Sequence, residues 1–406
     1  MIDKVQFRID VRRFAVGSRA PFIPVFSKRK YEELSEAEKA RVNFKIPYLR
    51  KFTLHPEKDE GSRAAISVEI YEKLNRERRT VEYEMVVQTS PTKLLLANNL
   101  TELSGSDGPA VFERLRQRLG EYGIMVTTAA IATAPLSVCH FAKNIPLPPD
   151  LKVQSIIKTL SKLDMGKAYD VNEDEQINKV RNRNNGRSVR LACGVREWSF
   201  YDKVDEMRCK TKRGAAGRQT PYEKDMVELY GLGGIEVFRM EYRLNKGQTI
   251  KSEFNTLLGR PCDTPVILED VFTETLWKTV LNNAWKKLTN RPDNQLALFS
   301  PDRKLDLYHH ILRKAEIRDK SAHSLNQALW SYGLATTIID HGVKTVRHGF
   351  NLIWSGKAVE RFEEKIRTAA ELAEGIPPSV DGIVFITRAL EQFQRVTLDS
   401  LKYGSF

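Results

Sequence analysis

Residues 236–244 read Glu-Val-Phe-Arg-Met-Glu-Tyr-Arg-Leu, and this stretch decides which fold the chain can adopt. Its charged and apolar side chains alternate, which is typical of a β-strand with one polar and one apolar face. Arg239, Glu241 and Arg243 share the polar face. A carboxylate between two guanidinium groups stays ionised, so it is ready to hold a metal ion, while the arginines can bind phosphate. The alternative is a cross-strand ladder of ion pairs on an exposed face.

The chain before this strand repeats the same two-residue period. We expect strands at residues 5–12, 65–71, 81–88, 127–142 and 189–201, the last with a turn near Gly194, and inserted helices at 109–121 and 151–164. From residue 250 onward the pattern is helical, with one apolar stripe formed by Trp277, Leu281, Trp285 and Leu288. The sequence therefore predicts an α+β fold. An antiparallel-sheet core spans residues 1–250, and an all-helical domain for DNA binding or oligomerisation spans residues 251–406.

The composition narrows the classes of function. The 406 residues carry 65 Lys and Arg against 52 Asp and Glu, and the net charge of +13 favours a polyanionic partner such as nucleic acid. A basic cytosolic enzyme without such a partner is the alternative. No apolar run reaches the roughly 18 residues of a membrane helix, and the N-terminal residues lack the apolar centre of a secretory signal. The four cysteines are scattered, so we expect no zinc site and no disulfide framework, and we expect a protein of the reducing cytoplasm.

Two segments before residue 236 carry side chains suited to phosphoryl chemistry. His140 ends an apolar strand, where a neutral imidazole can ligate a divalent cation; a structural histidine is the alternative. Tyr201 is followed by Lys203 and Glu206. A nearby cation can lower the pKa of a tyrosine and stabilise a phenolate that attacks phosphorus. The alternative is a strand end with a buried tyrosine and two solvated charges.

Basic loops flank Tyr201 in the sequence. We expect them to grip a nucleic-acid backbone through Arg181, Arg183, Arg187, Arg190, Lys210, Lys212, Arg213 and Arg218. Further along, residues 325–349 have the pattern of a helix-turn-helix with Gly342 in the turn, which would place Lys344, Arg347 and His348 against phosphate. Solvated loops without a partner and an ordinary packed helix pair are the respective alternatives.

Five short segments within residues 1–245 follow one another in an order that resembles that of a known protein family. They are Met1-Ile2-Asp3; Thr89-Ser90-Pro91-Thr92-Lys93-Leu94-Leu95 with Asn98; the strand that ends at His140; Tyr201-Asp202-Lys203 with Glu206; and Arg239-Met240-Glu241-Tyr242-Arg243. In this order they resemble the replication initiators of filamentous phages and related plasmids, the gene II/X class of rolling-circle nickases.

The resemblance implies an endonuclease core with the HUH/RRM-like antiparallel sheet of tyrosine nickases. Tyr201 would attack phosphorus at a double-stranded origin, stay on the 5′ end, free a 3′-OH that primes synthesis, and later rejoin the displaced strand. Lys203 would offset the charge of the phosphate or phenolate. The family implies Mg²⁺ or Mn²⁺, held by His140, Glu241 and Glu206, with the first two on adjacent strands. His140 stands where the phage initiators carry an aspartate, and the His-x-His pair of the wider superfamily is absent from the sequence.

The implied partners are the duplex origin, the single-stranded product, and a helicase and polymerase of the bacterial host, with no membrane. Arg239 and Arg243 would join the DNA contacts. Two other classes stay open. One is a non-catalytic DNA-binding repressor or partition protein, and the other is an RNA-binding protein whose aromatic-rich sheet stacks bases.

Overall fold

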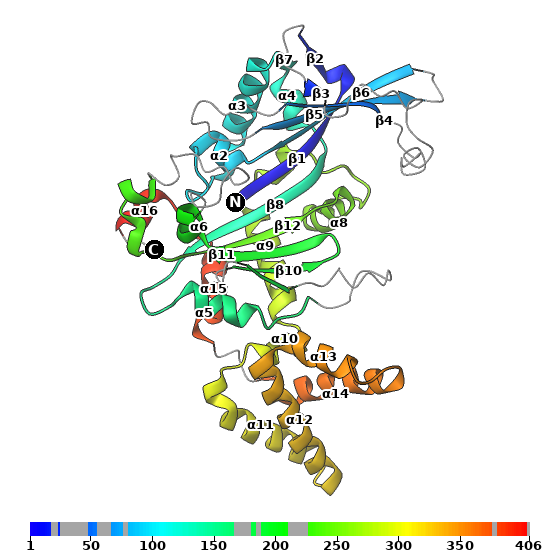
Figure 1. The fold of residues 1–406 in the computed structure, drawn as a ribbon, viewed down its shortest axis with the longest axis vertical. Coiled ribbons are helices and arrows are strands. Elements are labelled where there is room, and N and C mark those ends of the chain that lie inside the picture. Colours follow the sequence, from blue (N-terminus) through cyan, green and yellow to red (C-terminus); the bar gives the residue numbers. More distant parts are fainter. Residues whose placement is uncertain are drawn as a thin grey trace.

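The computed structural model describes residues 1–17, 23–24, 48–54, 66–75, 80–165, 180–183, 188–209, 226–375 and 380–403. These residues form a ten-stranded antiparallel sheet, a small second sheet of β2 (Phe14–Val16) and β7 (Ile124–Val126), and many helices (Figure 1). The predicted α+β class with an antiparallel sheet is therefore confirmed. In this part of the chain no helix combines the length and the apolarity needed to cross a membrane.

The ten strands pair in the order β3-β4-β5-β6-β1-β8-β12-β11-β10-β9. In chain order they are β1 (Ile2–Asp10), β3 (Ile23–Pro24), β4 (Tyr48–Leu54), β5 (Ser67–Asn75), β6 (Thr80–Thr89), β8 (Leu136–Pro146), β9 (Val180–Arg183), β10 (Ser188–Cys193), β11 (Arg196–Asp202) and β12 (Val237–Leu244). Both β1 and β12 pair with β8. The start of the chain and the segment near residue 240 thus lie on either side of one central strand.

The two faces of the central strands differ in polarity, as the alternation predicts. Trp198 of β11 and Tyr242 of β12 are buried with their ring centroids 4.8 Å apart, and Trp198 also contacts Trp285 of α9 (Glu274–Thr289). Phe141 of β8 packs against Phe254 of α8 (Gly247–Leu258). The helices α8 and α9 therefore cover the apolar face, while the charged side chains of β11 and β12 point to the opposite side.

One predicted strand is partly wrong. Only β8, from Leu136 onward, forms within the segment 127–142, and Thr128–Ala132 forms the short helix α4 instead. The physical reason is local, because the Thr127 side chain caps this helix by accepting a hydrogen bond from the backbone N–H of Ala130, and alanine favours helices. The predicted turn at Gly194 is confirmed, with a φ of 54°.

Among the described residues before α8, the other α-helices are α2 (Pro91–Leu96), α3 (Gly108–Glu121), α5 (Val153–Leu160) and α6 (Lys203–Cys209). From α8 onward the described helices lie in three places. α8, α9 and α15 (Asp381–Gln392) contact the sheet, whereas a helical bundle extends from one end of it (Figure 1). The bundle consists of α10 (Pro292–Ala297), α11 (Lys304–Arg318), α12 (Ala322–His341), α13 (Val343–Asn351) and α14 (Lys357–Ala373). The last helix, α16 (Leu398–Tyr403), joins a small apolar cluster with Val204 and Met207 of α6. The predicted boundary near residue 250 falls inside α8.

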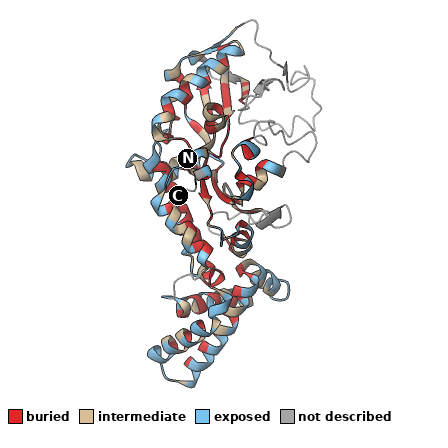
Figure 2. Cartoon of the chain, turned by 90° about the vertical axis from the view of Figure 1, so that its left-hand side faces the viewer, coloured by how far each residue is buried: buried red, intermediate tan, exposed pale blue. Residues whose placement is uncertain are grey.

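The buried residues are distributed differently in the sheet region and in the helical bundle (Figure 2). The strands and the helices against them carry most of the buried positions in the upper part, while in the bundle the buried residues form an inner stripe and the outer surfaces are exposed.

The helix-turn-helix expectation is wrong for Arg347. Its guanidinium pairs with Asp164 at 2.8 Å, Asp293 at 3.1 Å and Glu363 at 2.8 Å, so it ties the bundle together and does not face a phosphate. Gly342 does stand in the turn, with a φ of 84°, and the two helices α12 and α13 contact each other. For Lys344 and His348 the expectation stays a prediction.

Candidate active site

Six polar side chains of three neighbouring strands share one face of the sheet. In the register of the strands, Tyr201 of β11 lies opposite Arg239 of β12, which lies opposite Asn144 of β8. Further along, Arg243 lies opposite His140. Residues directly opposite one another in an antiparallel pair point to the same side, so the register alone brings these groups together. The pairing of β8 with β12 agrees with the prediction that His140 and Glu241 lie on adjacent strands.

Glu241 is the centre of this group. Its Oε1 accepts hydrogen bonds from the Tyr201 hydroxyl at 2.5 Å and from Arg239 Nε at 2.9 Å, and its Oε2 accepts one from Arg243 Nη2 at 2.5 Å. The residue is 3% exposed. Burial alone would raise its pKa, but the two guanidinium groups outweigh burial and hold the pKa of Glu241 well below its usual range. Glu241 is therefore a carboxylate at every pH near neutrality.

Arg239 joins Glu241 to the start of the chain. Its side chain is fully buried, and it donates to the backbone oxygen of Asn99 at 2.8 Å, to Asn144 Oδ1 at 2.9 Å and to the carboxylate of Asp3. Four acceptors around one buried guanidinium satisfy most of its donors. In this arrangement Arg239 holds the site together, and its buried side chain does not reach solvent, contrary to its predicted role as a DNA contact.

Tyr201 is a protonated phenol in this arrangement. Burial, followed by the neighbouring charge of Glu241, raises the pKa of Tyr201 well above its ordinary value. Directly after it, the Asp202 carboxylate caps α6 by accepting from the backbone N–H of Val204 at 2.9 Å. This cap starts the helix that carries Lys203, whose Nζ lies 6.0 Å from the centre of the Tyr201 ring.

Lys203 is buried and donates to Glu206 Oε2 at 2.6 Å. The expected proximity of Tyr201, Lys203 and Glu206 is therefore present, with Glu206 paired to a lysine.

His140 is 8% exposed, and its Nε2 lies 3.0 Å from Asn245 Oδ1. Burial lowers the pKa of His140, and the positive charge of Arg243 lowers it further. The hydrogen bond with Asn245 raises this pKa but does not outweigh the lowering. The imidazole is therefore neutral near pH 7.

The atoms of this site that could ligate a metal are not arranged to hold a divalent cation in this structure. Both oxygens of Glu241 contact cationic or hydroxyl donors, Glu206 is bonded to Lys203, and the Nε2 of His140 is bonded to Asn245. Within the described ranges, no three His, Cys, Asp or Glu side chains gather into a possible metal site. A cation beside Glu241 would also meet the two arginines, which repel it.

The predicted DNA contacts divide into three groups. Arg243 and Arg190 both bond to Glu197 Oε1, at 2.7 and 2.5 Å, and form a cross-strand ladder across β10, β11 and β12. Arg181 and Arg183 lie on the edge strand β9. The remaining predicted contacts lie outside the described residues: Arg187, Lys210, Lys212, Arg213 and Arg218.

Sequence reasoning missed three residues of this site. They are Asp3, Asn144 and Glu197, and each one contacts an arginine of β12 from another strand. Asp3 belongs to one of the five segments that resemble the phage initiators. The sequence around Asp3, Asn144 or Glu197 does not, however, predict that any of them contacts an arginine. A single carboxylate or amide gives no signal in the sequence, because its partner is chosen by strand order and register.

No protein-family model, no curated protein and no solved structure matches this chain. Its function is therefore inferred from the geometry of this polar face.

Proposed function

We propose that the chain is a DNA strand transferase that nicks one strand through Tyr201 and keeps the 5′ end as a phosphotyrosine. The observation that carries this proposal is the 2.5 Å hydrogen bond from the Tyr201 hydroxyl to Glu241, beside two arginines. Guanidinium groups next to a nucleophilic hydroxyl can stabilise the charge that develops on a phosphodiester under attack. The biological role that this chemistry would serve is initiation of rolling-circle replication, on an HUH-like sheet in the cytoplasm of a bacterial host, together with its helicase and polymerase.

The cleavage step exchanges one phosphate ester for another. Tyr201 Oη forms a bond to phosphorus while the bond from phosphorus to the 3′ oxygen breaks, and the phenolic proton ends on that 3′ oxygen. The products are a phosphotyrosine and a free 3′-OH. The reverse step rejoins a strand, so neither direction needs a nucleotide cofactor.

Substrate binding has to change the resting arrangement, because Tyr201 is held protonated. The Arg239 side chain is fully buried, whereas that of Arg243 is 20% exposed. Arg243 is thus the guanidinium that a phosphodiester can reach. We expect the phosphate to compete with Glu241 for Arg243, while Arg239 keeps its contacts.

The predicted Mg²⁺ or Mn²⁺ stays a prediction, and no step above depends on it. Its test is nicking of supercoiled DNA with added Mn²⁺ and with a chelator. Loss of nicking on chelation would mean that the donors of His140, Glu241 or Glu206 rearrange when DNA binds.

The proposal is tested by transfer of a label from DNA to protein. Single-stranded oligonucleotides of random sequence and supercoiled plasmid are incubated with the protein, and the products are separated under denaturing conditions. A 3′ label should move to the protein and a 5′ label should not, because the tyrosine keeps the downstream fragment.

Two variants locate the nucleophile in this assay. Tyr201→Phe should abolish the labelled protein. The matched control is Tyr242→Phe, which alters a tyrosine on the opposite face of the neighbouring strand and should leave labelling intact. Labelling of Tyr201→Phe at the wild-type rate would move the nucleophile elsewhere, and the absence of any labelled wild-type protein would refute the proposal.

The raised pKa of Tyr201 favours a second candidate. A non-catalytic repressor, partition protein or RNA-binding protein could use the same polar face as a platform. This candidate predicts equal binding of nucleic acid by wild type and Tyr201→Phe, with no transfer of label in either.

A further inference from the structure

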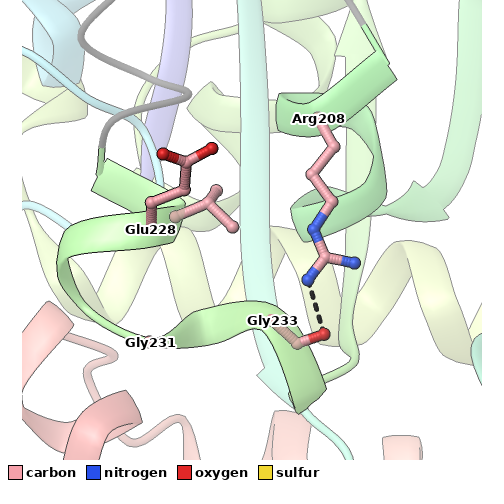
Figure 3. Close-up of a pocket in the computed structure, with 5 residues that line it drawn as sticks. Arg208, Glu228, Gly231 and Gly233 are labelled. Carbon is pink, nitrogen blue, oxygen red and sulfur yellow. Dashed lines mark hydrogen bonds between the residues drawn. The ribbon is translucent and has the colours of Figure 1, made fainter.

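Lys4 of β1 is a basic side chain without a partner in the described part of the protein. Other cations near the site are already bonded. In the pocket beside α6 (Figure 3), for example, the guanidinium of Arg208 donates to the backbone oxygen of Gly233. Lys4 is half-buried, yet within the described ranges its Nζ forms no hydrogen bond and no ion pair. Its ammonium group is therefore available to a ligand.

A β-bulge brings both Asp3 and Lys4 to the polar face of the sheet. On β8 the partners of Ile2 and Lys4 are successive residues, so β1 advances by two residues where β8 advances by one. The extra residue is Asp3, whose carboxylate bonds to Arg239 on the polar face. Asp3 and Lys4 are accordingly half-buried in succession, whereas exposure alternates along the rest of β1. Bulges are frequent next to active sites, where they redirect a side chain.

Lys4, His140 and Arg243 form a row across three strands. Lys4 of β1 and Arg243 of β12 each lie directly opposite His140 of β8, on its two sides, so the three side chains point to the same face. The two cations are two strand spacings apart, which places their backbones about 10 Å from each other. Both have long stems, so their charged ends can contact one small group above the imidazole.

This row carries positive charge that the protein does not fully compensate. Burial lowers the pKa of Lys4, and the charge of Arg243 lowers it further. The carboxylates of Asp3 and Glu241 raise this pKa but do not outweigh the lowering. His140 between the two cations is neutral and offers no negative charge. An anion bound between Lys4 and Arg243 would relieve the repulsion between them.

We propose that Lys4, together with Arg243, binds the phosphate of the DNA strand next to the one that Tyr201 attacks. The Tyr201 hydroxyl and Arg243 Nη2 bond to the two oxygens of Glu241, both at 2.5 Å, so Arg243 lies beside the nucleophile. Lys4 is three strands away from Tyr201 in the order β1-β8-β12-β11, about 14 Å, and four residues along the strands, about 13 Å. A single phosphate cannot contact both, and a neighbouring phosphate of the same strand fits Lys4.

Lys4 is thus a positioning residue, which fixes the register of the strand relative to Tyr201. In this respect the inference rests on the proposed function. The contact is with the backbone of the nucleic acid, so it does not depend on the base sequence.

Binding by the Tyr201→Phe variant, in which the proposed cleavage cannot occur, measures the contact directly. The affinity for a thymidine oligonucleotide is determined at several salt concentrations, with Lys4 present and with Lys4→Gln added. Loss of one phosphate contact should reduce the salt slope of log affinity by about 0.7 unit for single-stranded DNA. It should also weaken binding about tenfold, as expected for one charge-assisted hydrogen bond. Because Lys4 contributes no bond to the fold, Lys4→Gln should remain folded.

Two further variants separate a bound phosphate from a structural effect. Lys4→Arg keeps the charge and should preserve the slope. The matched control is Lys251→Gln, the same change at another half-buried lysine, on the helix α8 that covers the opposite face of the sheet; it should leave the slope unaltered. An unchanged slope in Lys4→Gln, or an equal reduction in Lys251→Gln, would overturn the inference.

Titration with inorganic phosphate identifies the source of the anion. Binding of inorganic phosphate that depends on Lys4, with an unchanged oligonucleotide slope in Lys4→Gln, would assign the site to a small free anion and overturn the contact with DNA. A slope that depends on Lys4, in a wild-type protein that never accepts a 3′ label, would support the site while refuting the proposed cleavage. A labelled wild type whose slope does not depend on Lys4 would do the reverse.

Discussion

Replacement of Arg239 by methionine should destabilise the protein more than any surface change. The substitution keeps an unbranched side chain of similar length but removes the charge that neutralises Asp3 and Glu241. Removal of one partner from a buried ion pair costs about 3–5 kcal/mol, because it leaves the other charge buried without compensation. Both carboxylates keep some other contacts, such as Arg243 for Glu241, so we expect a loss near the lower end of this range.

The assay is equilibrium unfolding in urea, followed by tryptophan fluorescence, with Arg116→Met as the matched control. Arg116 lies on the exposed surface of α3 and pairs with Glu113 at 2.5 Å. An exposed pair of this kind contributes little, because solvent screens it. The free energy of unfolding should therefore fall by about 3 kcal/mol for Arg239→Met and should change little for the control. If Arg239→Met does not fold, Arg239→Lys is the milder variant: it keeps the charge but cannot reproduce all the guanidinium hydrogen bonds to Asn99, Asn144 and Glu241, so its loss of stability should lie between those of the control and Arg239→Met.

The pH dependence of the free energy of unfolding tests whether the loss of stability arises from the carboxylate of Glu241. The pKa of Glu241 is depressed in the folded protein, so its ionised form contributes stability above its unfolded pKa, near 4.3, and this contribution is lost as the pH falls further. The variant lacks the contribution, and the gap between variant and wild type should shrink below about pH 4. A loss below about 1 kcal/mol, or a gap that does not change with pH, would refute the reasoning that Arg239 acts through the carboxylates that it contacts.

Three further changes test other parts of the molecule. Trp285→Ala should cost about 3–5 kcal/mol in urea unfolding, because it opens a cavity between α9 and Trp198; a loss below about 1 kcal/mol would mean that α9 does not bury this face. The pKa of His140 is lowered in the folded state, so its protonation opposes folding as the pH falls below the unfolded value near 6.5, and His140→Gln should lose less stability than wild type between about pH 7.5 and 5. Equal losses in the two proteins would show that another group titrates. The third change neutralises Lys210, Lys212 and Arg213 together. It should weaken DNA binding equally for all sequences and reduce the salt slope of log affinity by nearly one unit for each phosphate contact that is lost. An unchanged slope would point to DNA contacts elsewhere in the chain.

The sequence by itself determined the local elements. The alternation over residues 236–244 predicts a strand with Arg239, Glu241 and Arg243 on one face, and β12 has this arrangement. The spacing of apolar residues and the residue types of a turn depend only on neighbours in the chain, so they can be recognised without knowledge of the fold. The exception at residues 128–132 has the same local origin, because the cap at Thr127 outweighs the strand pattern.

Only the tertiary structure decided which charges meet. Asp3 and Arg239 come together because β1 and β12 flank the same strand, and Glu197 joins the ladder because β11 pairs with β12 in one particular register. A shift of one residue would turn Tyr201 to the apolar face. The tertiary structure also decided that Glu241 is buried between the guanidinium groups of Arg239 and Arg243. Burial, register and long-range pairing depend on the whole fold, and for this reason the composition of a single strand could suggest the residues of this site but could not predict their contacts.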